Sequence, residues 1–136
     1  MEKINKLITL LIAIANFAKD IHYNCKGEAF YSKHLLADRI QDNIYDFIDQ
    51  IKEVFFLASN NEPLPSGEYL ARSALIVPPV SAKDKDCFIS MENLLVLALQ
   101  QIEEITEATT GEENLLGAIA QDLQTSLGLV NNQIKE

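Results

Sequence analysis

The sequence predicts an all-α fold, in which four long amphipathic helices form a bundle with one long connection between the second and the third. Two observations predict this fold. Apolar residues recur at three- and four-residue steps through most of the chain. All four prolines fall between residues 63 and 79, so they divide the helical pattern into two halves. At 136 residues the chain is expected to form a single domain over 1–136.

The first predicted helix spans residues 4–23, and its apolar positions are spread over a wide face. They are Ile4, Leu7, Ile8, Leu11, Ile12, Ala15, Ala18 and Ile21, widened by Leu10, Ile14 and Phe17. The run follows two lysines and so imitates a secretory signal, but its periodicity is that of a packed helix, and we expect a cytoplasmic protein. No apolar run reaches the roughly 20 residues that span a membrane.

A second helix is predicted from Phe30 to about Ala58, after a stop at Asn24, Lys26 and Gly27. Its apolar stripe consists of Phe30, Tyr31, Leu35, Ile40, Ile44, Phe47, Ile48, Ile51, Val54 and Phe55. Residues 59–89 then contain every proline and a charged run at 83–86. No continuous helix can cross this stretch, so we expect a long crossover. A short helix over Gly67 to Ala74, started by Ser66, is predicted in its middle.

The third and fourth predicted helices fill the rest of the chain. Ser90 predicts the N-cap of the third helix, which carries apolar residues to Ile105 and is expected to stop at Gly111. The fourth helix has its apolar stripe between Leu115 and Ile134. Short, long and short connections are typical of ferritin-like four-helix bundles. An up-down-up-down bundle with a disordered middle loop is the alternative, but so long a loop is unusual inside a compact domain.

The charge of the chain narrows the classes of partner. Eleven Lys and Arg stand against twenty Asp and Glu, a net charge of -9, which argues against binding DNA by neutralising its phosphates. The carboxylates suit the handling of cations, although an acidic surface that keeps the protein soluble explains them as well. Cys25 and Cys87 are too few and too far apart for a disulfide scaffold, so we expect two reduced thiols.

The only two histidines flank the first predicted turn. His22 and His34 are about equally far from its centre near residue 27, so an antiparallel hairpin brings them level with each other. Asp38 follows His34 by four residues and therefore lies one turn further on the same helix face. Two imidazoles and a carboxylate suit Fe(II), Mn(II) or Zn(II) better than Ca(II) or Mg(II).

A second candidate half-site lies further along the same helix. Asp49 and Glu53 are four residues apart. Asp38 precedes Asp49 by eleven residues, or about three helical turns, so the three residues share nearly the same face. Those eleven residues rise about 16 Å, so one chain cannot bring both pairs to one ion. A two-fold axis near Asn43 would instead bring His34 and Asp38 of one copy to the second pair of another. From this geometry alone, a metal site and a chance arrangement of core histidines and solvated acids both remain open.

The spacing of these five residues resembles that of the Dps family of miniferritins, as does the motif HYNCKG at 22–27. The segment PLPSGEYL at 63–70 is similar to the short crossover helix of that family, and the resemblance covers essentially the whole chain. It implies a homo-oligomer, a dodecameric hollow shell, that oxidises Fe(II) at centres shared between two subunits. Hydrogen peroxide would be the preferred oxidant and oxygen the other. The ferric product would be stored inside, which protects against oxidative damage.

The resemblance also implies roles for individual residues. His22, Asp49 and Glu53 would be the principal iron ligands, with His34 and Asp38 completing the site directly or through water. Zn(II) is a plausible substitute for iron at such nitrogen and oxygen ligands.

Five further residues take more peripheral roles under the same resemblance. Tyr23 stands where the family commonly has a Trp and would pack beside the centre. Glu112 and Glu113, at the turn between the third and fourth helices, are candidates for an iron entry pore. Two acids of the second helix, Asp42 and Asp46, would help to nucleate mineral if they face the cavity, or would otherwise form a solvated face.

Two features separate this chain from neighbouring classes. It has no basic tail, so the DNA binding of the Dps family is not carried over. Large ferritins and di-iron oxygenases build their centre within one bundle from Glu-x-x-His pairs, and neither histidine here has a Glu three residues before it. The alternative function is a non-catalytic shell or interaction protein of the same fold, with or without a structural Zn(II).

Overall fold

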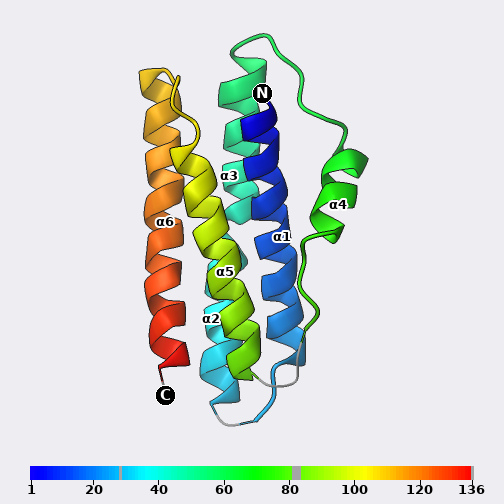
Figure 1. The fold of residues 1–136 in the computed structure, drawn as a ribbon, viewed down its shortest axis with the longest axis vertical. Coiled ribbons are helices and arrows are strands. Elements are labelled where there is room, and N and C mark those ends of the chain that lie inside the picture. The colour runs from blue at the N-terminus through cyan, green and yellow to red at the C-terminus, as the bar shows by residue number, and fades with distance from the viewer. Residues whose placement is uncertain (28, 81–83, 136) are drawn as a thin grey trace.

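A computed structural model describes residues 1–27, 29–80 and 84–135 (Figure 1), and this part of the chain is all-helical, without strands. Its elements are α1 (Glu2–Asn24), α2 (Phe30–Asp42), α3 (Ile44–Ile51), the π-helical η1 (Lys52–Leu57), α4 (Ser66–Ala74), α5 (Asp84–Glu103) and α6 (Thr110–Ile134). The helices α1, α5 and α6 and the rod formed by α2, α3 and η1 run along the long axis, while α4 lies outside them. No described helix combines the length and apolar character that a membrane span requires.

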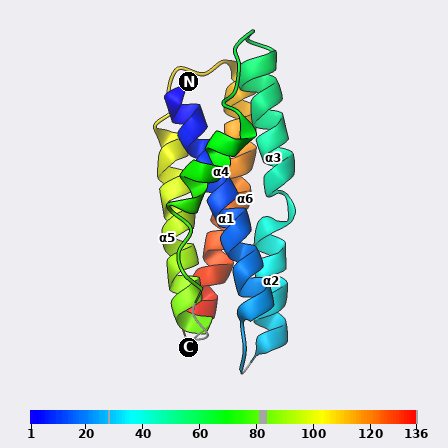
Figure 2. The ribbon, with the colours of Figure 1, turned by 90° about the vertical axis from the view of Figure 1, so that its right-hand side faces the viewer.

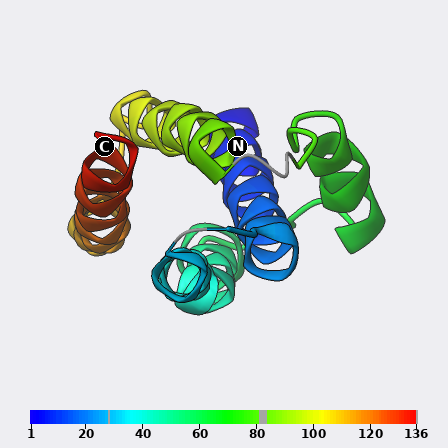
Figure 3. The ribbon, with the colours of Figure 1, turned by 90° about the horizontal axis from the view of Figure 1, so that it is seen from below.

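Helix α1 is the centre of the molecule. It contacts α2, α3, α4 and α5, and Figure 3 shows it between these elements. A helix that is apolar on most of its circumference must be buried on most sides, and α1 is buried almost continuously from Ile4 to Ile21. The wide apolar face predicted from the sequence is therefore confirmed.

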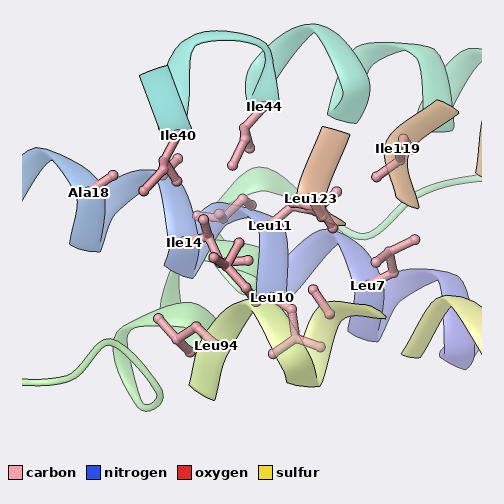
Figure 4. Packing of buried hydrophobic residues seen from close by; sticks show 14 of the residues in the cluster. Leu7, Leu10, Leu11, Ile14, Ala18, Ile40, Ile44, Leu94, Ile119 and Leu123 are labelled. Atoms are coloured by element: carbon pink, nitrogen blue, oxygen red, sulfur yellow. The ribbon is translucent and has the colours of Figure 1, made fainter. Parts of the chain in front are cut away.

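The core forms where side chains of α1 meet those of every other long element. Leu11 and Ile14 pack among residues of the α2–α3 rod, α5 and α6 (Figure 4), and both are fully buried. Their labelled neighbours in that view include Ile40, Ile44, Leu94, Ile119 and Leu123. Burying one such aliphatic side chain contributes about 1.5–3 kcal/mol. The long apolar patterns of the sequence thus account for the way the rods pack.

The second predicted helix is not one continuous α-helix, and this prediction is corrected. Asn43 separates α2 from α3, with φ of −99° and ψ of 0°, at the edge of the right-handed helical region. The last segment, η1, is π-helical: the Ala58 amide donates to the Glu53 carbonyl at 2.8 Å, five residues back. Buried positions continue at steps of three and four across the break, so periodicity alone could not reveal it. They are Ala37, Ile40, Ile44, Ile48, Ile51 and Phe55.

The short crossover helix is confirmed as α4, but its start differs from the prediction. Ser66 is the first helical residue and makes no capping bond, and Pro65 occupies the N-cap position instead. The φ of Pro65 is −58°, the value its ring imposes and one that leads directly into a helix.

The third helix begins earlier than predicted. Ser90 lies inside α5, which starts at Asp84, so this serine is not an N-cap. Cys87 and Phe88 are buried and extend the apolar stripe upstream of Ser90. Part of the charged run assigned to the loop therefore belongs to the first turn of the helix, and its first residue, 83, lies outside the described ranges.

The end of the third helix also differs from the prediction. Helix α5 ends at Glu103, and Gly111 lies in the first turn of α6 instead of terminating α5. Thr109 caps α6: its hydroxyl accepts from the Glu112 amide at 3.2 Å, and its own amide donates to the Glu112 carboxylate at 2.9 Å. This capping box satisfies two amides at the helix start, so it places the turn before residue 109.

Candidate metal centre

The first turn brings the two histidines face to face. The rings of His22, near the end of α1, and His34, near the start of α2, are stacked with centroids 3.5 Å apart and planes 22° apart. The prediction that the hairpin brings them level is confirmed. Each ring also bonds the other helix: His22 Nδ1 lies 3.1 Å from the His34 carbonyl oxygen, and His34 Nδ1 lies 2.7 Å from the His22 carbonyl oxygen.

These two bonds determine which ring nitrogen can bind a metal. A carbonyl oxygen only accepts hydrogen bonds, so Nδ1 of each neutral ring carries the hydrogen. The lone pair is therefore left on Nε2 of both rings. Metal-binding histidines typically donate their other ring N–H to a carbonyl or carboxylate in this way, which sets the tautomer and the ring orientation.

Aromatic side chains surround the histidine pair. Tyr23 contacts His22 edge to face, with ring centroids 4.8 Å apart, and Phe30 contacts His34 at 5.3 Å. Tyr23 is itself 73% exposed, so most of its side chain faces solvent beside the histidine. The aromatic residue expected beside the centre thus lies against the first candidate ligand.

The carboxylates lie along the rod formed by α2, α3 and η1. Asp38 is half-buried one turn beyond His34, and its Oδ1 accepts a hydrogen bond from Gln41 Nε2 at 3.1 Å. Asp49, on α3, and Glu53, in η1, are both exposed. Neither makes a side-chain hydrogen bond or an ion pair within the described ranges, so their oxygens are available to a cation.

One chain does not bring these residues to a single point. In the part of the chain that the structure describes, no three His, Cys, Asp or Glu side chains gather closely enough to hold a metal ion. The histidine pair lies at the α1–α2 end of the rod, whereas Asp49 and Glu53 lie beyond the break at Asn43 (Figure 2). A single chain therefore carries two separate half-sites.

An exposed stripe accompanies the half-sites and was not expected from the sequence. Tyr31 is 69% exposed, Leu35 47% and Tyr45 52%, although the periodicity assigned Tyr31 and Leu35 to the apolar stripe of the helix. Together with Asp38 and Asp49 they recur at steps of three, four and seven, which is the spacing of one helix face. Tyr31, Leu35 and Tyr45 thus lie along one side of the rod and remain exposed in the single chain.

The π-helical segment is a second feature that the sequence did not reveal. It contains Glu53, and its widened turn begins at the residue before it. π-Helical turns are rare and are found frequently at functional sites. The apolar periodicity of Phe55 and Phe56, both buried, is compatible with an α-helix as well, so no sequence signal distinguishes the two.

The remaining predicted residues lie away from the histidine pair. Glu112 is half-buried and engaged in the capping box, so it has a structural role at the start of α6, while Glu113 beside it is exposed. Asp42 and Asp46 are exposed on the rod, as both of their expected roles require.

The chemistry of the site rests on its own residues. No protein-family model matches the chain, and no curated protein matches it significantly. Two imidazoles oriented by backbone carbonyls supply nitrogen donors in one half-site. In the other half-site, Asp49 and Glu53 supply carboxylate oxygens that make no hydrogen bond or ion pair within the described residues. Nitrogen and oxygen donors of these kinds suit Fe(II), Mn(II) or Zn(II).

Proposed function

We propose that this protein is a ferroxidase of the ferritin-like, Dps-type class, which oxidises Fe(II) at centres shared between two copies of the chain and stores the ferric product in a shell. The observation that carries the proposal is the stacked pair of His22 and His34. Each ring is held by its Nδ1 and offers Nε2, an orientation typical of metal ligands. The arrangement of four long helical rods with a crossover helix outside them supports a ferritin-like four-helix bundle.

The centre needs a second copy of the chain, because one chain carries only half-sites. A two-fold axis that crosses the rod near Asn43 would place His34 and Asp38 of one copy opposite Asp49 and Glu53 of the other, twice per dimer. The exposed stripe of Tyr31, Leu35 and Tyr45 would be buried by the same contact. Aromatic residues are enriched at the buried core of protein interfaces, so this surface suits such a dimer.

The residues suit the oxidation of iron by peroxide. One hydrogen peroxide molecule accepts two electrons, one from each of two Fe(II) ions, and with two protons leaves as two water molecules. The anionic side chains of Asp49 and Glu53 offset the additional positive charge as Fe(III) forms, and neutral imidazoles leave coordination positions open for the oxidant. The net charge of -9 raises the local concentration of cations around the molecule.

The experiment adds Fe(II) to the purified protein without oxygen and then hydrogen peroxide, and follows ferric absorbance and particle size together. We expect rapid oxidation and a soluble, iron-loaded particle of about twelve subunits, the assembly that the resemblance implies. The double variant Asp49→Ala/Glu53→Ala should oxidise iron no faster than buffer. The matched control, Glu103→Ala/Glu107→Ala, removes two exposed acids, one at the C-terminal end of α5 and one in the turn that follows it, and should behave as the wild type.

Two results would refute the proposal. Wild-type protein that oxidises iron no faster than buffer, with iron precipitating outside the particle, excludes a ferroxidase. Unchanged oxidation by the double variant excludes the assigned ligands. Metal that stays bound without turnover would favour the non-catalytic shell with a structural Zn(II).

A further inference from the structure

A lysine stands beside the second half-site without pairing with it. Lys52 precedes Glu53 directly and follows Asp49 by three residues, a spacing at which opposite charges on a helix commonly pair. Its ammonium instead lies over the ring of Tyr69, with Nζ 5.2 Å from the ring centroid. This distance is within the range of a cation–π interaction. Among the described residues Lys52 forms no ion pair with either carboxylate.

The ring that holds this cation is itself held firmly. Tyr69 belongs to the crossover helix α4 and is only 1% exposed. Its hydroxyl donates to Asn5 Oδ1 at 2.6 Å and accepts from the Leu64 amide at 3.2 Å. Asn5 is itself a buried residue of α1, so the hydroxyl is fastened to the central helix. The ring therefore has one position relative to α1.

A second set of contacts fixes α4 as a whole. The Arg72 guanidinium donates to Glu2 on α1 at 2.7 Å and to Glu68 one turn earlier on α4 at 3.1 Å. Ser73, on the same helix, is buried. Hydrogen bonds and ion pairs thus connect α4 to α1 at two points, and α4 forms a rigid support for the tyrosine ring.

We propose that Tyr69 is a positioning residue for the carboxylate pair: by holding the Lys52 ammonium over its ring, it keeps this cation away from Asp49 and Glu53. The role rests on the proposed function. An ammonium paired with either carboxylate would have to be displaced by the metal and would repel it, because like charges a few ångströms apart interact unfavourably even in water. The crossover helix therefore prepares a metal half-site that it does not itself contain.

The test measures the affinity of the full-length protein for Co(II), a divalent ion that binds such ligands and is stable to air, by titration calorimetry. Tyr69→Leu removes the aromatic face, and we expect it to weaken Co(II) binding about two- to fivefold, the range of a partly exposed cation–π contact. Tyr69→Phe loses the hydroxyl bonds but keeps the aromatic face, whose burial still fixes the ring, so this variant should bind as the wild type does. Lys52→Met should also change the affinity by less than about twofold, because this cation is already held away from the carboxylates.

The double variant separates this role from a general effect on stability. Tyr69→Leu/Lys52→Met should recover the wild-type affinity, since the cation that invades the site is gone, whereas a purely structural loss would persist. Lys19→Met, which removes an exposed lysine of α1, should leave Tyr69→Leu unrescued when combined with it. Particle size is measured for each variant, so that changes in assembly are detected.

The outcomes distinguish this inference from the proposed function. Wild-type protein that binds no Co(II) refutes the proposed function and, with it, the role of Tyr69. Wild-type binding that Tyr69→Leu leaves unchanged, or weakens without recovery in the double variant, refutes the role of Tyr69 alone.

Discussion

The imidazoles of His22 and His34 stack with centroids 3.5 Å apart, and each donates through Nδ1 to the backbone carbonyl of the other residue. The two residues therefore join the end of α1 to the start of α2 through Nδ1, and Nε2 of each ring takes no part in these bonds. Under the proposed function, metal would bind through Nε2, whereas the contact between the two helices uses Nδ1 of the same rings, so substitution can separate the two roles.

His22→Asn is expected to separate them. The asparagine amide nitrogen occupies nearly the position of Nδ1 and can still donate to the His34 carbonyl, but no atom replaces Nε2. We expect metal binding to be lost, while the free energy of unfolding should stay closer to wild type than in His22→Ala. The difference between the two variants should be about 0.5–1.5 kcal/mol, the net contribution of one hydrogen bond. Urea unfolding and a metal titration measure the two effects, and equal loss of stability in both variants would contradict the bond's contribution.

Tyr45→Glu tests whether the exposed stripe on the rod joins two copies. Tyr45 is 52% exposed, so the isolated chain should fold normally, but a charge placed in a buried contact lacks a partner and opposes association. We expect a smaller particle by light scattering and unchanged helical content by circular dichroism. Leu129→Glu, at a 42% exposed position of α6, is the control and should assemble as the wild type. Wild-type assembly of the Tyr45 variant would exclude this stripe from the interface.

The stability of the fold should fall at alkaline pH because of Tyr69. Burial raises the pKa of its phenol above the ordinary value of 10.0. A group whose pKa is higher in the folded state contributes stability that is complete below pH 10.0 and is lost as the pH rises through the folded pKa. The comparison uses Lys52→Met as the background, because this variant lacks the ammonium over the ring. Urea unfolding of Lys52→Met should show a loss of unfolding free energy at alkaline pH, and the double variant Lys52→Met/Tyr69→Phe should not. The same loss in both variants would contradict the assignment of this effect to Tyr69.

Ile14→Ala tests the central position of α1 in the core. Ile14 is fully buried among the other long elements, and its truncation leaves a cavity. We expect a loss of about 2–5 kcal/mol in the free energy of unfolding. Leu75→Ala removes a side chain that is 87% exposed and should stay within about 0.5 kcal/mol of the wild type. Similar losses at both positions would mean that α1 is not the packing centre.

Short-range patterns in the sequence determined several features of the fold and of the candidate site. The apolar positions of α1 recur so regularly that its burial followed from the residues alone. The equal distance of His22 and His34 from their turn predicted that they meet, because residues equally far from the turn of an antiparallel hairpin lie level with each other. The prolines and the short helical segment between them likewise determined a crossover carrying α4. Each of these depends on residues within a few turns of one another.

The tertiary structure decided what depends on segments far apart in the chain. Buried positions keep their spacing across Asn43 and through η1, so only the packed rod distinguishes a broken and π-helical segment from one α-helix. Tyr31 repeats with the core residues yet is exposed, because no other described element covers that face of α2. Lys52 likewise lies over Tyr69 and not beside its neighbouring carboxylates, because α4, which is far from Lys52 in sequence, places an aromatic ring within its reach. Helical periodicity predicts which residues share a face. Which face is covered, and which charged side chains remain without a partner in the described chain, depends on the contacts between helices.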